Sequence, residues 1–351
     1  MSGPPLSRPT PYLLVDPAAV AANVTAMAAH ARTHGLALRP HAKTHKTAEV
    51  ARAQLDAGAT GLTVATVSEA EVFADAGCTD LFVAYPLWVD AAKGARLRAL
   101  SARASLLAGV DSIEGARALA AQVPGTAVLV EVDSGQHRSG VPPQEAGALA
   151  ECAHRAGLEV RGVFTFPGHS YAPGAAAGVA RDEAAAVGRA ARSLSEHGIE
   201  PVVVSGGSTP SAADADASVL TELRPGVYVF GDAQQWELGS TTRERIALTC
   251  VATVVSHAGG RVLLDSGSKA LGADRAGFAT GHGRLLDHPD ARISQLSEHH
   301  AVVTWDASPR PPLGSRLRVV PNHVCTAVNL ADELVTTDGD VWPVAARGAN
   351  T

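Results

Sequence analysis

The chain has 351 residues, enough for a barrel-sized domain and a smaller second one, and 46% of them are hydrophobic. The net charge of −6, from 29 basic and 35 acidic residues, comes without a basic stripe, which argues against a nucleic-acid partner. The first residues form no apolar signal segment, no apolar run is long enough to cross a membrane, and the four cysteines follow no motif spacing. We therefore expect a cytoplasmic protein with free thiols and no membrane partner.

Short apolar runs alternate with Ala-rich amphipathic stretches over the first two thirds of the chain. Such alternation predicts buried parallel strands joined by helices. There are eight runs, the number that closes a (β/α)8 barrel, and an open doubly wound sheet is the alternative. The runs are 36–42, 62–66, 81–86, 105–110, 127–133, 160–166, 201–207 and 226–230.

After residue 240 the helical periodicity largely disappears. The segments that resemble strands are 245–256, 261–265, 300–305, 315–320 and 323–330, and residues 257–260 have the composition of a hairpin turn. The sequence therefore predicts an α/β protein with an N-terminal (β/α)8 barrel over 17–240 and a C-terminal β-rich domain over 241–351. We expect the opening strand, 10–16, to pair with the second domain.

Lysine occurs only four times, at Lys43, Lys46, Lys93 and Lys269. Lys43 lies in RPHAKTHKT, at the C-terminal end of the first predicted strand, where barrel active sites form. Period-two alternation would place Arg39, His41 and Lys43 on one face, and buried cations are costly unless they serve a ligand. We therefore expect Lys43, and not the other three lysines, to react with a carbonyl cofactor; a surface lysine is the ordinary alternative.

Two glycine loops follow the last two predicted barrel strands. The first is Ser205-Gly206-Gly207-Ser208-Thr209, and the second lies in LRPGVYVF, residues 223–230. Glycines let the backbone approach an anion, and barrels commonly hold phosphates in the loops after strands seven and eight. These loops predict a phosphate site, with tight turns that bind nothing as the alternative.

Polar residues also follow the fifth and sixth predicted strands. EVDSGQHRSGV, residues 131–141, contains Asp133, His137 and Arg138, and a buried arginine there could hydrogen-bond a planar anionic group. A surface turn is the alternative. FPGHSY, residues 166–171, places His169 and Tyr171 at the same rim of the barrel.

The segment PNHVCTAVN, residues 321–329, pairs an imidazole with a thiol. His323 and Cys325 are two residues apart on a predicted strand, so both side chains would point the same way. This donor pair suits Zn²⁺ and leaves coordination positions open, as a catalytic metal requires. A small core cysteine is the alternative. His299 and His300 could contribute from a neighbouring segment.

Seven motifs, taken in order, resemble the D-serine dehydratase / D-threonine aldolase family, which belongs to the alanine-racemase-like, fold-type III enzymes of pyridoxal phosphate. They are RPHAKTHKT, EVDSGQHRSGV, PGHSY, SGGSTP, LRPGVYVF, DSGSKALGAD and PNHVC. The resemblance runs from Thr10 to Val335. It implies a cofactor-binding barrel, a β domain that carries metal ligands, and a homodimer.

The resemblance also implies roles for individual residues. Lys43 would carry pyridoxal 5′-phosphate as a Schiff base, Arg138 would lie beside its ring, and His323 with Cys325 would hold a divalent metal, Zn²⁺ or alternatively Mn²⁺ or Mg²⁺. The other residues implied at the cofactor are Tyr171, Ser205, Gly207, Ser208, Thr209, Arg224, Gly226 and Val227. His41, His169 and Tyr228 are expected near the substrate.

The expected activity is a lyase reaction on a small β-hydroxy D-amino acid. We expect D-serine to be converted to pyruvate and ammonia, because Cys325 stands where aldolase members typically have aspartate. Retro-aldol cleavage of the D-threonine type, to glycine and an aldehyde, is the main alternative; a racemase and a non-catalytic cofactor carrier are others. In SEHHAVV, His299 stands where the family usually has an acidic residue, which leaves the substrate preference open.

Overall fold

The computed structural model describes residues 8–305 and 309–351, and the chain forms two compact units. The first unit contains residues 26–43, 51–226 and 349–351, and the second contains residues up to 25, 44–50 and 227–348. Residues 1–7, where a signal segment would begin, lie outside the described part of the chain.

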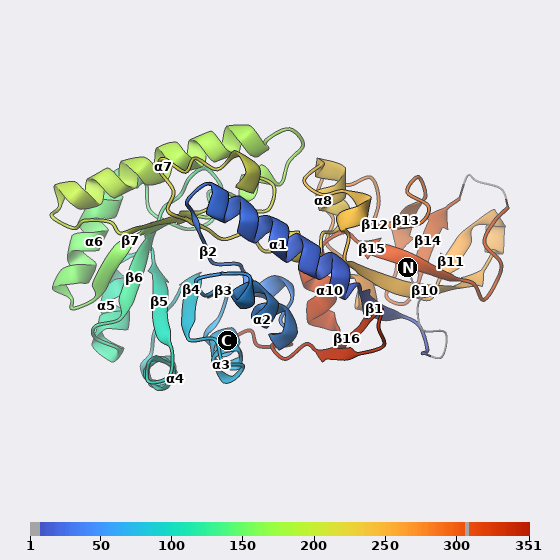
Figure 1. Ribbon diagram of the computed structural model, residues 1–351, viewed down its shortest axis with the longest axis horizontal. Helices are drawn as coiled ribbons and strands as arrows, with labels where there is room; N and C mark the ends of the chain where they lie inside the picture. The colour runs from blue at the N-terminus through green and yellow to red at the C-terminus, as the bar shows by residue number, and fades with distance from the viewer. Residues whose placement is uncertain (1–7, 306–308) are drawn as a thin grey trace. The chain divides into compact units, whose positions relative to one another are not determined.

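Eight parallel strands form the sheet of the first unit, which is the predicted (β/α)8 barrel (Figure 1). The sheet closes because His41 forms a parallel bridge with Thr63, which joins the first strand to the second in chain order. The strands are β2 (Ala37–Leu38), β3 (Leu62–Val64), β4 (Asp80–Pro86), β5 (Ser105–Val110), β6 (Ala127–Glu131), β7 (Glu159–Phe164), β8 (Val203–Gly206) and β9 (Glu222–Leu223).

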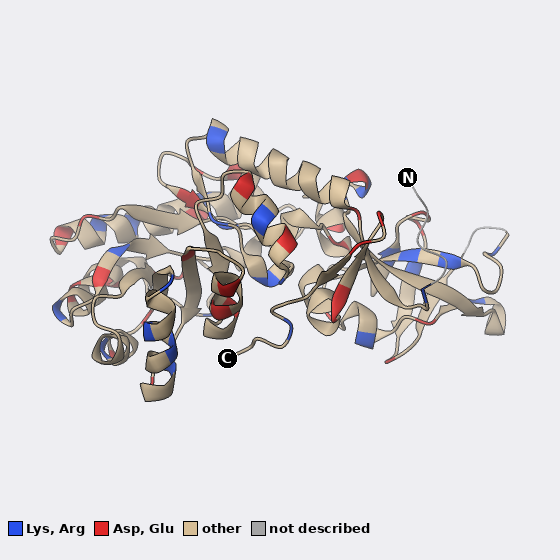
Figure 2. Ribbon diagram, turned by 60° about the horizontal axis from the view of Figure 1, so that its bottom comes forward, with Lys and Arg blue, Asp and Glu red and all other residues tan. Residues whose placement is uncertain are grey.

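Helices connect these strands, and several begin at capping residues that the sequence supplies. Thr66, Asp90 and Ser112 each accept a hydrogen bond from the backbone amide three residues later, which satisfies an otherwise unpaired donor. The helices are α1 (Pro17–Thr33), α2 (Ala48–Asp56), α3 (Val67–Asp75), α4 (Ala91–Ser101), α5 (Ile113–Gln122), α6 (Ala146–Arg155) and α7 (Ala176–Glu196). Acidic and basic residues are interspersed along the helices of this unit (Figure 2).

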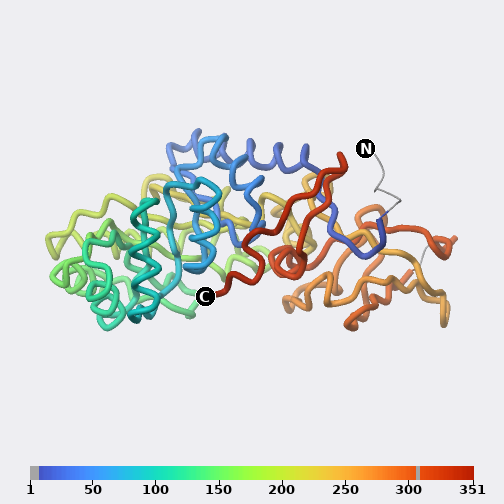
Figure 3. Tube along the Cα trace, turned by 90° about the horizontal axis from the view of Figure 1, so that it is seen from below, coloured from blue at the N-terminus to red at the C-terminus, as the bar shows by residue number. Residues whose placement is uncertain are grey.

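The C-terminus of the chain returns to the barrel unit beside α3 (Figure 3). Ser68 donates hydrogen bonds to the Thr351 carbonyl from its amide, at 2.8 Å, and from its hydroxyl, at 2.7 Å.

Two of the predicted barrel strands are wrong in extent. The first is only Ala37–Leu38, because Pro40 lacks an amide proton and interrupts the ladder. Ala42–Thr44 form a 3₁₀ turn, so Lys43 does not share a strand face with Arg39 and His41. The eighth strand is Glu222–Leu223 instead of 226–230, since Pro225 and Gly226 end it and Val227–Val229 form another 3₁₀ turn.

The barrel interior combines an apolar cluster with paired charges. Phe82, Leu107, Leu129 and Phe164 pack together, and the two phenyl rings meet edge to face with centroids 5.0 Å apart. Arg39 donates from Nε to Glu222 at 2.8 Å and from Nη1 to Asp80 at 2.6 Å. The prediction that Arg39 is buried to serve a ligand is therefore wrong, because these two carboxylates balance its charge.

The second unit is built on a nine-stranded sheet in the described residues, with the order β11-β14-β13-β12-β15-β10-β1-β16-β17. An additional pairing of β10 with β11 closes six of these strands into a small antiparallel barrel. Residues 258–260 turn between β10 and β11, as predicted. The strands are β1 (Tyr12–Val15), β10 (Leu248–Ser256), β11 (Val262–Leu264), β12 (Gly283–Leu285), β13 (Arg292–Leu296), β14 (Ala301–Thr304), β15 (Arg316–Pro321), β16 (Glu333–Thr336) and β17 (Val341–Pro343).

The opening strand of the chain lies inside this sheet. β1 pairs antiparallel with β10, where Leu13 faces Cys250, and parallel with β16, where Leu14 faces Val335. The short helices α8 (Ala233–Leu238) and α9 (Ser268–Leu271) also belong to the second unit.

The strand predicted over 323–330 is wrong. Residues Val324–Leu330 form helix α10, and His323 is its N-terminal capping position. The β-branched residues suggested a strand, but Asp232, far away in the sequence, accepts a hydrogen bond from the Val324 amide at 3.2 Å and thereby stabilises the first helical turn.

All four cysteines are free, as predicted. Among the described residues, no helix combines the length and the apolar character that crossing a bilayer would need.

Candidate active site

A cavity of about 360 Å³ lies at the C-terminal ends of the barrel strands, within the first unit. Its walls come from the C-terminal ends of β3, β4, β6, β7 and β9 and from the segments that follow β2 and β6. They include Lys43, Glu131, Arg138, Phe166 and Arg224. The volume falls in the range of small-molecule sites, and the position is the one that active sites occupy in such barrels.

Lys43 is half-buried at this cavity. Its Nζ lies 5.4 Å from the centroid of the Phe166 ring, and its backbone amide donates to His41 Nδ1 at 3.4 Å. His41 itself is buried and also lines the cavity.

The other three lysines have different surroundings. Lys46 is buried with a positive φ of 52° and donates to Asn329 at 2.7 Å. Lys93 lies on α4, and Lys269 pairs with Glu298 at 2.8 Å on the surface of the second unit.

Arg138 also approaches Phe166, with its Cζ 5.5 Å from the ring centroid. The side chain is exposed and lines the cavity from its rim, so the prediction of a buried arginine is wrong. Asp133 and His137 form the turn that precedes it, with His137 Nδ1 2.7 Å from Asp133 Oδ2. Although burial raises the pKa of Asp133, hydrogen bonds from the Gly135 and His137 amides and the His137 ring lower it overall. For these two residues the surface-turn alternative is correct.

Glu131, which the sequence interpretation did not single out, ends β6 inside the cavity wall. It is 4% exposed, and its Oε1 accepts a hydrogen bond from Ser139 at 2.8 Å. Its Oε2 has no hydrogen-bond partner among the described residues. Burial raises the pKa of Glu131, and the nearby Arg138 and Arg224 oppose that rise. The available sequence signal was an acid inside the mostly apolar run AVLVEVD, two residues before Asp133.

Arg224 is buried against Phe82 and Phe164, with its Cζ 5.5 and 5.2 Å from the ring centroids. Burial lowers the pKa of Arg224, and three carboxylates, Glu222 first among them, act in the opposite direction. Its Nε donates to Ser205 Oγ at 2.8 Å, and Ser205 Oγ donates to Glu222 at 2.7 Å. The Ser205 hydroxyl thus belongs to the network inside the barrel.

Residues 205–209, which we call the glycine loop, comprise the last two residues of β8 and the three that follow it in the first unit. Gly207 has a φ of +82° and no room for a Cβ, which would lie 2.7 Å from Leu223. Its amide donates to Glu183 on α7 at 2.7 Å. The Ser208 hydroxyl lies 2.8 Å from those of both Ser170 and Ser211, so three buried hydroxyls gather at the loop. Thr209 is buried as well.

The remaining predicted residues lie in short turns. His169 is in the 3₁₀ turn Gly168–Ser170, and its Nδ1 is buried with no partner in the described part of the chain. The Tyr171 ring centroid lies 6.3 Å from that of Phe166. Gly226 is the last residue of its segment in the first unit, whereas Val227 and Tyr228 are buried in a 3₁₀ turn of the second unit.

His323 and Cys325 are brought together in the second unit by the start of α10. The negative charge of Cys325 raises the pKa of His323 to about 11, against the effect of burial, and hydrogen bonds to Asp232 and Cys325 add to the rise. His323 Nδ1 lies 3.3 Å from the fully buried carboxylate of Asp232, and Cys325 Sγ lies 3.3 Å from Thr44 Oγ1. A carboxylate behind a histidine is the usual support of a metal-binding imidazole.

No group of three His, Cys, Asp or Glu side chains with metal-binding geometry occurs among the described residues. A metal held by His323 and Cys325 would therefore keep coordination positions for other ligands. His299 and His300 are exposed between β13 and β14.

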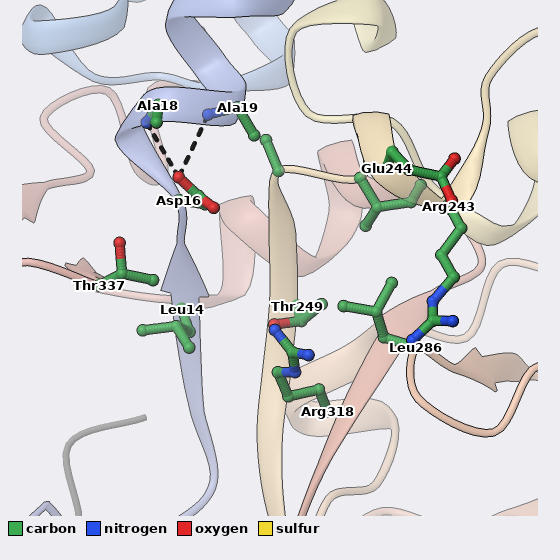
Figure 4. A pocket seen from close by; sticks show the side chains of 12 residues that line it. Leu14, Asp16, Ala18, Ala19, Arg243, Glu244, Thr249, Leu286, Arg318 and Thr337 are labelled. Atoms are coloured by element: carbon green, nitrogen blue, oxygen red, sulfur yellow. Dashed lines mark hydrogen bonds between the residues drawn. The ribbon is translucent and has the colours of Figure 1, made fainter. Parts of the chain in front are cut away.

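A second cavity, of about 530 Å³, lies in the second unit and contains none of the predicted residues (Figure 4). Arg318 and Arg243 on its wall both pair with Asp287, at 2.7 and 3.2 Å, and Asp16 accepts hydrogen bonds from the first amides of α1. These charges are thus balanced within the fold.

Two family models match the chain in succession. Residues 15–234 match the alanine racemase N-terminal domain, and residues 247–337 match a putative serine dehydratase domain. The chain is 35% identical to D-threo-3-hydroxyaspartate dehydratase of Delftia sp. over 368 residues, which cover 96% of each protein. It is 38% identical to D-threonine aldolase of Arthrobacter sp. over 367 residues, covering 99% of this chain and 95% of the aldolase.

Solved structures show the same relationship. The crystal structure of the Delftia dehydratase superimposes with a TM-score of 0.88 at 33% identity, covering 96% of this chain and 98% of that one. A cysteine-to-alanine variant of that dehydratase, in a metal-free form, also superimposes with a TM-score of 0.88 at 32% identity, with the same two shares covered.

Proposed function

The chain belongs to the alanine-racemase-like family of pyridoxal-phosphate enzymes that includes D-threo-3-hydroxyaspartate dehydratase and D-threonine aldolase, and on that premise we propose that it is a metal-dependent D-serine dehydratase. The reaction would convert D-serine to pyruvate and ammonia. The single observation that carries the proposal is the position of Lys43, whose amine lies at the barrel cavity, 5.4 Å from the centroid of the Phe166 ring.

The residues at the cavity fit pyridoxal phosphate. Lys43 supplies the amine that bonds to the cofactor's carbonyl, and Phe166 and Arg138 supply flat surfaces for its ring. The unpartnered Oε2 of Glu131 offers a hydrogen-bonding group to whatever fills the cavity. The phosphate would be held by the glycine loop, where Ser208 and Thr209 are the available hydroxyl residues, and by the backbone near Gly226 and Val227.

When bound, the cofactor supplies an electron sink for the pair of electrons that a departing proton leaves on the substrate α-carbon. The protein has to hold the substrate and move that proton. Lys43 would move that proton, because its side-chain amine lies at the cavity and an amine in its neutral form can accept a proton. His41 and Tyr171 would limit the space beside Lys43 and so help to orient the substrate.

His323 and Cys325 fit a divalent metal, and we propose that they hold one, with Zn²⁺ preferred by a thiolate and an imidazole. Such an ion supplies a Lewis acid for the β-hydroxyl of the substrate. Asp232 would keep the His323 ring in place. Support comes from the metal-free cysteine variant of the related dehydratase.

The second candidate is retro-aldol cleavage, which the similarity to D-threonine aldolase favours. Product analysis separates the two. The purified protein is incubated with D-serine, D-threonine and D-threo-3-hydroxyaspartate, with and without chelator. A keto acid plus ammonia supports the dehydratase, whereas glycine plus an aldehyde would replace it with an aldolase.

The same experiment tests the more distant alternatives. Formation of the L-enantiomer would indicate a racemase, and absence of any product from all three substrates would favour a cofactor carrier. We also propose a homodimer, to be checked by the molar mass in solution against the 35.8 kDa of one chain.

A further inference from the structure

Helix α7 buries one acidic side chain completely against the glycine loop. Glu183 is 0% exposed, and its Oε1 accepts the hydrogen bond from the Gly207 amide at 2.7 Å. Its Oε2 is buried and has no hydrogen-bond partner among the described residues. The carboxyl group is therefore held by a single hydrogen bond, which is little compensation for a buried negative charge.

The contact between Glu183 and the loop is direct. A Cβ on Gly206 would lie 2.3 Å from Glu183 Oε1, so the absence of a side chain at residue 206 lets the carboxyl reach the backbone. Gly207 then takes a φ of +82°, which turns its amide toward Glu183. Glu183 thus fixes the conformation of the loop from the side of α7.

Arg224 is the charged group that acts on Glu183. Burial raises the pKa of Glu183, and the Gly207 amide and Arg224 oppose that rise, so that the net pKa is about 7. Titratable residues on the elements that pack against α7 are Glu145, Glu151, Cys152, His154, Arg155, Glu159, Arg161, His169 and Asp214. None of them contributes to this shift.

We propose that Glu183 is a positioning residue that takes up a proton when the glycine loop takes up the phosphate of the cofactor. The inference rests on the proposed function, which places that phosphate at the loop. A phosphate ester carries a charge of about −1.5 to −2 at pH 7. A loop with phosphate at one side and a carboxylate at the other would hold two anions close together in a low dielectric, which favours the protonated acid.

Protonation leaves the function of Glu183 in the loop intact. The proton would sit on Oε2, and Oε1 would remain the acceptor for the Gly207 amide. An unpaired neutral hydroxyl costs less to bury than an unpaired charged oxygen. Cofactor binding should therefore weaken as the pH rises and Glu183 resists protonation.

The test compares pyridoxal phosphate with pyridoxal, which lacks the phosphate, by absorbance titration of the full-length protein between pH 7 and 9. The pH dependence of the bond to Lys43 is common to both ligands and cancels in the ratio of their affinities. In the wild-type protein the affinity for pyridoxal phosphate divided by the affinity for pyridoxal should fall with rising pH, by up to about tenfold per pH unit. In Glu183→Gln, which keeps an acceptor for Gly207, the ratio should stay constant.

Glu196→Gln is the matched control, because Glu196 is exposed on the same helix. It should keep the wild-type slope. A constant ratio in the wild-type protein, or an equal slope in Glu183→Gln, would overturn the inference while leaving the proposed function standing. If neither ligand binds to the wild-type protein, the proposed function fails first and the inference falls with it.

A measurement on the wild-type protein alone covers the case in which Glu183→Gln does not fold. Calorimetry in buffers of different ionisation enthalpy counts the protons taken up on binding. Near pH 8, pyridoxal phosphate should take up nearly one proton more than pyridoxal does. Equal proton uptake by the two ligands contradicts the proposal.

Discussion

The Lys43 amine lies 5.4 Å from the centroid of the Phe166 ring, and the Arg138 guanidinium lies 5.5 Å from the same centroid. One aromatic ring therefore sets the position of both cations at the rim of the barrel cavity. Attraction between a cation and a ring is typically about 0.5–2 kcal/mol, enough to favour one arrangement of each long side chain.

Lys43→Ala should remove the visible absorbance that pyridoxal phosphate gains when a lysine holds it. Loss of the amine also removes the proposed α-proton base, so activity should fall by roughly 10²–10⁴-fold or more. Absorbance spectra and product formation check both effects. Lys269→Ala is the control, because Lys269 is exposed and paired with Glu298 in the other unit. An unchanged spectrum in Lys43→Ala would exclude Lys43 as the anchor.

Cys325→Ala should lose bound metal and β-elimination but keep the absorbance of the cofactor. The reason is that the proposed ligands, Cys325 and His323, lie in the second unit, whereas Lys43 belongs to the barrel. Asp232→Asn should lower metal affinity by about 10- to 100-fold, since it weakens the support of the His323 ring. Elemental analysis after gel filtration measures the metal. The control is Cys152→Ala, which changes a free cysteine on α6 and should retain the bound metal.

Glu183→Gln should stabilise the cofactor-free protein at neutral and alkaline pH. The pKa of Glu183 is raised from 4.5 to about 7 in the folded protein. As the pH rises, Glu183 therefore loses its proton at a lower pH in the unfolded chain than in the folded one. The wild type therefore loses stability as the pH rises from about 4.5 to 7, and the loss is constant above that. The full shift corresponds to roughly 3 kcal/mol. Denaturant unfolding at pH 4.5 and pH 8 should show the gain only at pH 8; an equal gain at both would contradict it.

Gly206→Ala should destabilise the barrel unit by about 1–3 kcal/mol, because the new methyl group would meet Glu183 Oε1 at 2.3 Å and Leu220 at 3.0 Å. Gly188→Ala is the matched change on α7, where the nearest atom lies at 3.4 Å in Val219. A helical alanine there should stabilise by about 0.5–1 kcal/mol. Thermal melting of the two variants compares them, and a neutral Gly206→Ala would show that the loop can move away from α7.

The sequence was sufficient for the barrel and for the position of Lys43. Buried strands such as 105–110 keep their apolar pattern whatever surrounds them, and the end of the first strand is a fixed location in a barrel. The shortened strands at Pro40 and Pro225 could have been recognised, since proline cannot donate to a ladder.

Other features depend on contacts that no local pattern contains. Helix α10 replaces a predicted strand because Asp232, 92 residues before Val324, accepts a hydrogen bond from the Val324 amide. Glu131 and Glu183 acquire their importance from burial, which depends on the elements that cover them. In the sequence Glu131 lies in a mostly apolar run, and Glu183 lies in an Ala-rich helix directly after Asp182.

The place of β1 in the sheet has a consequence for synthesis of the chain. Residues 12–15 are synthesised well before their partners, because both neighbours of their strand, β10 and β16, lie more than two hundred residues later in the chain. During that interval the apolar segment YLLV has no sheet to join, and pairings so distant in sequence form slowly. A nascent chain would therefore have to shield this segment, or rely on a chaperone to do so, until the last strands emerge.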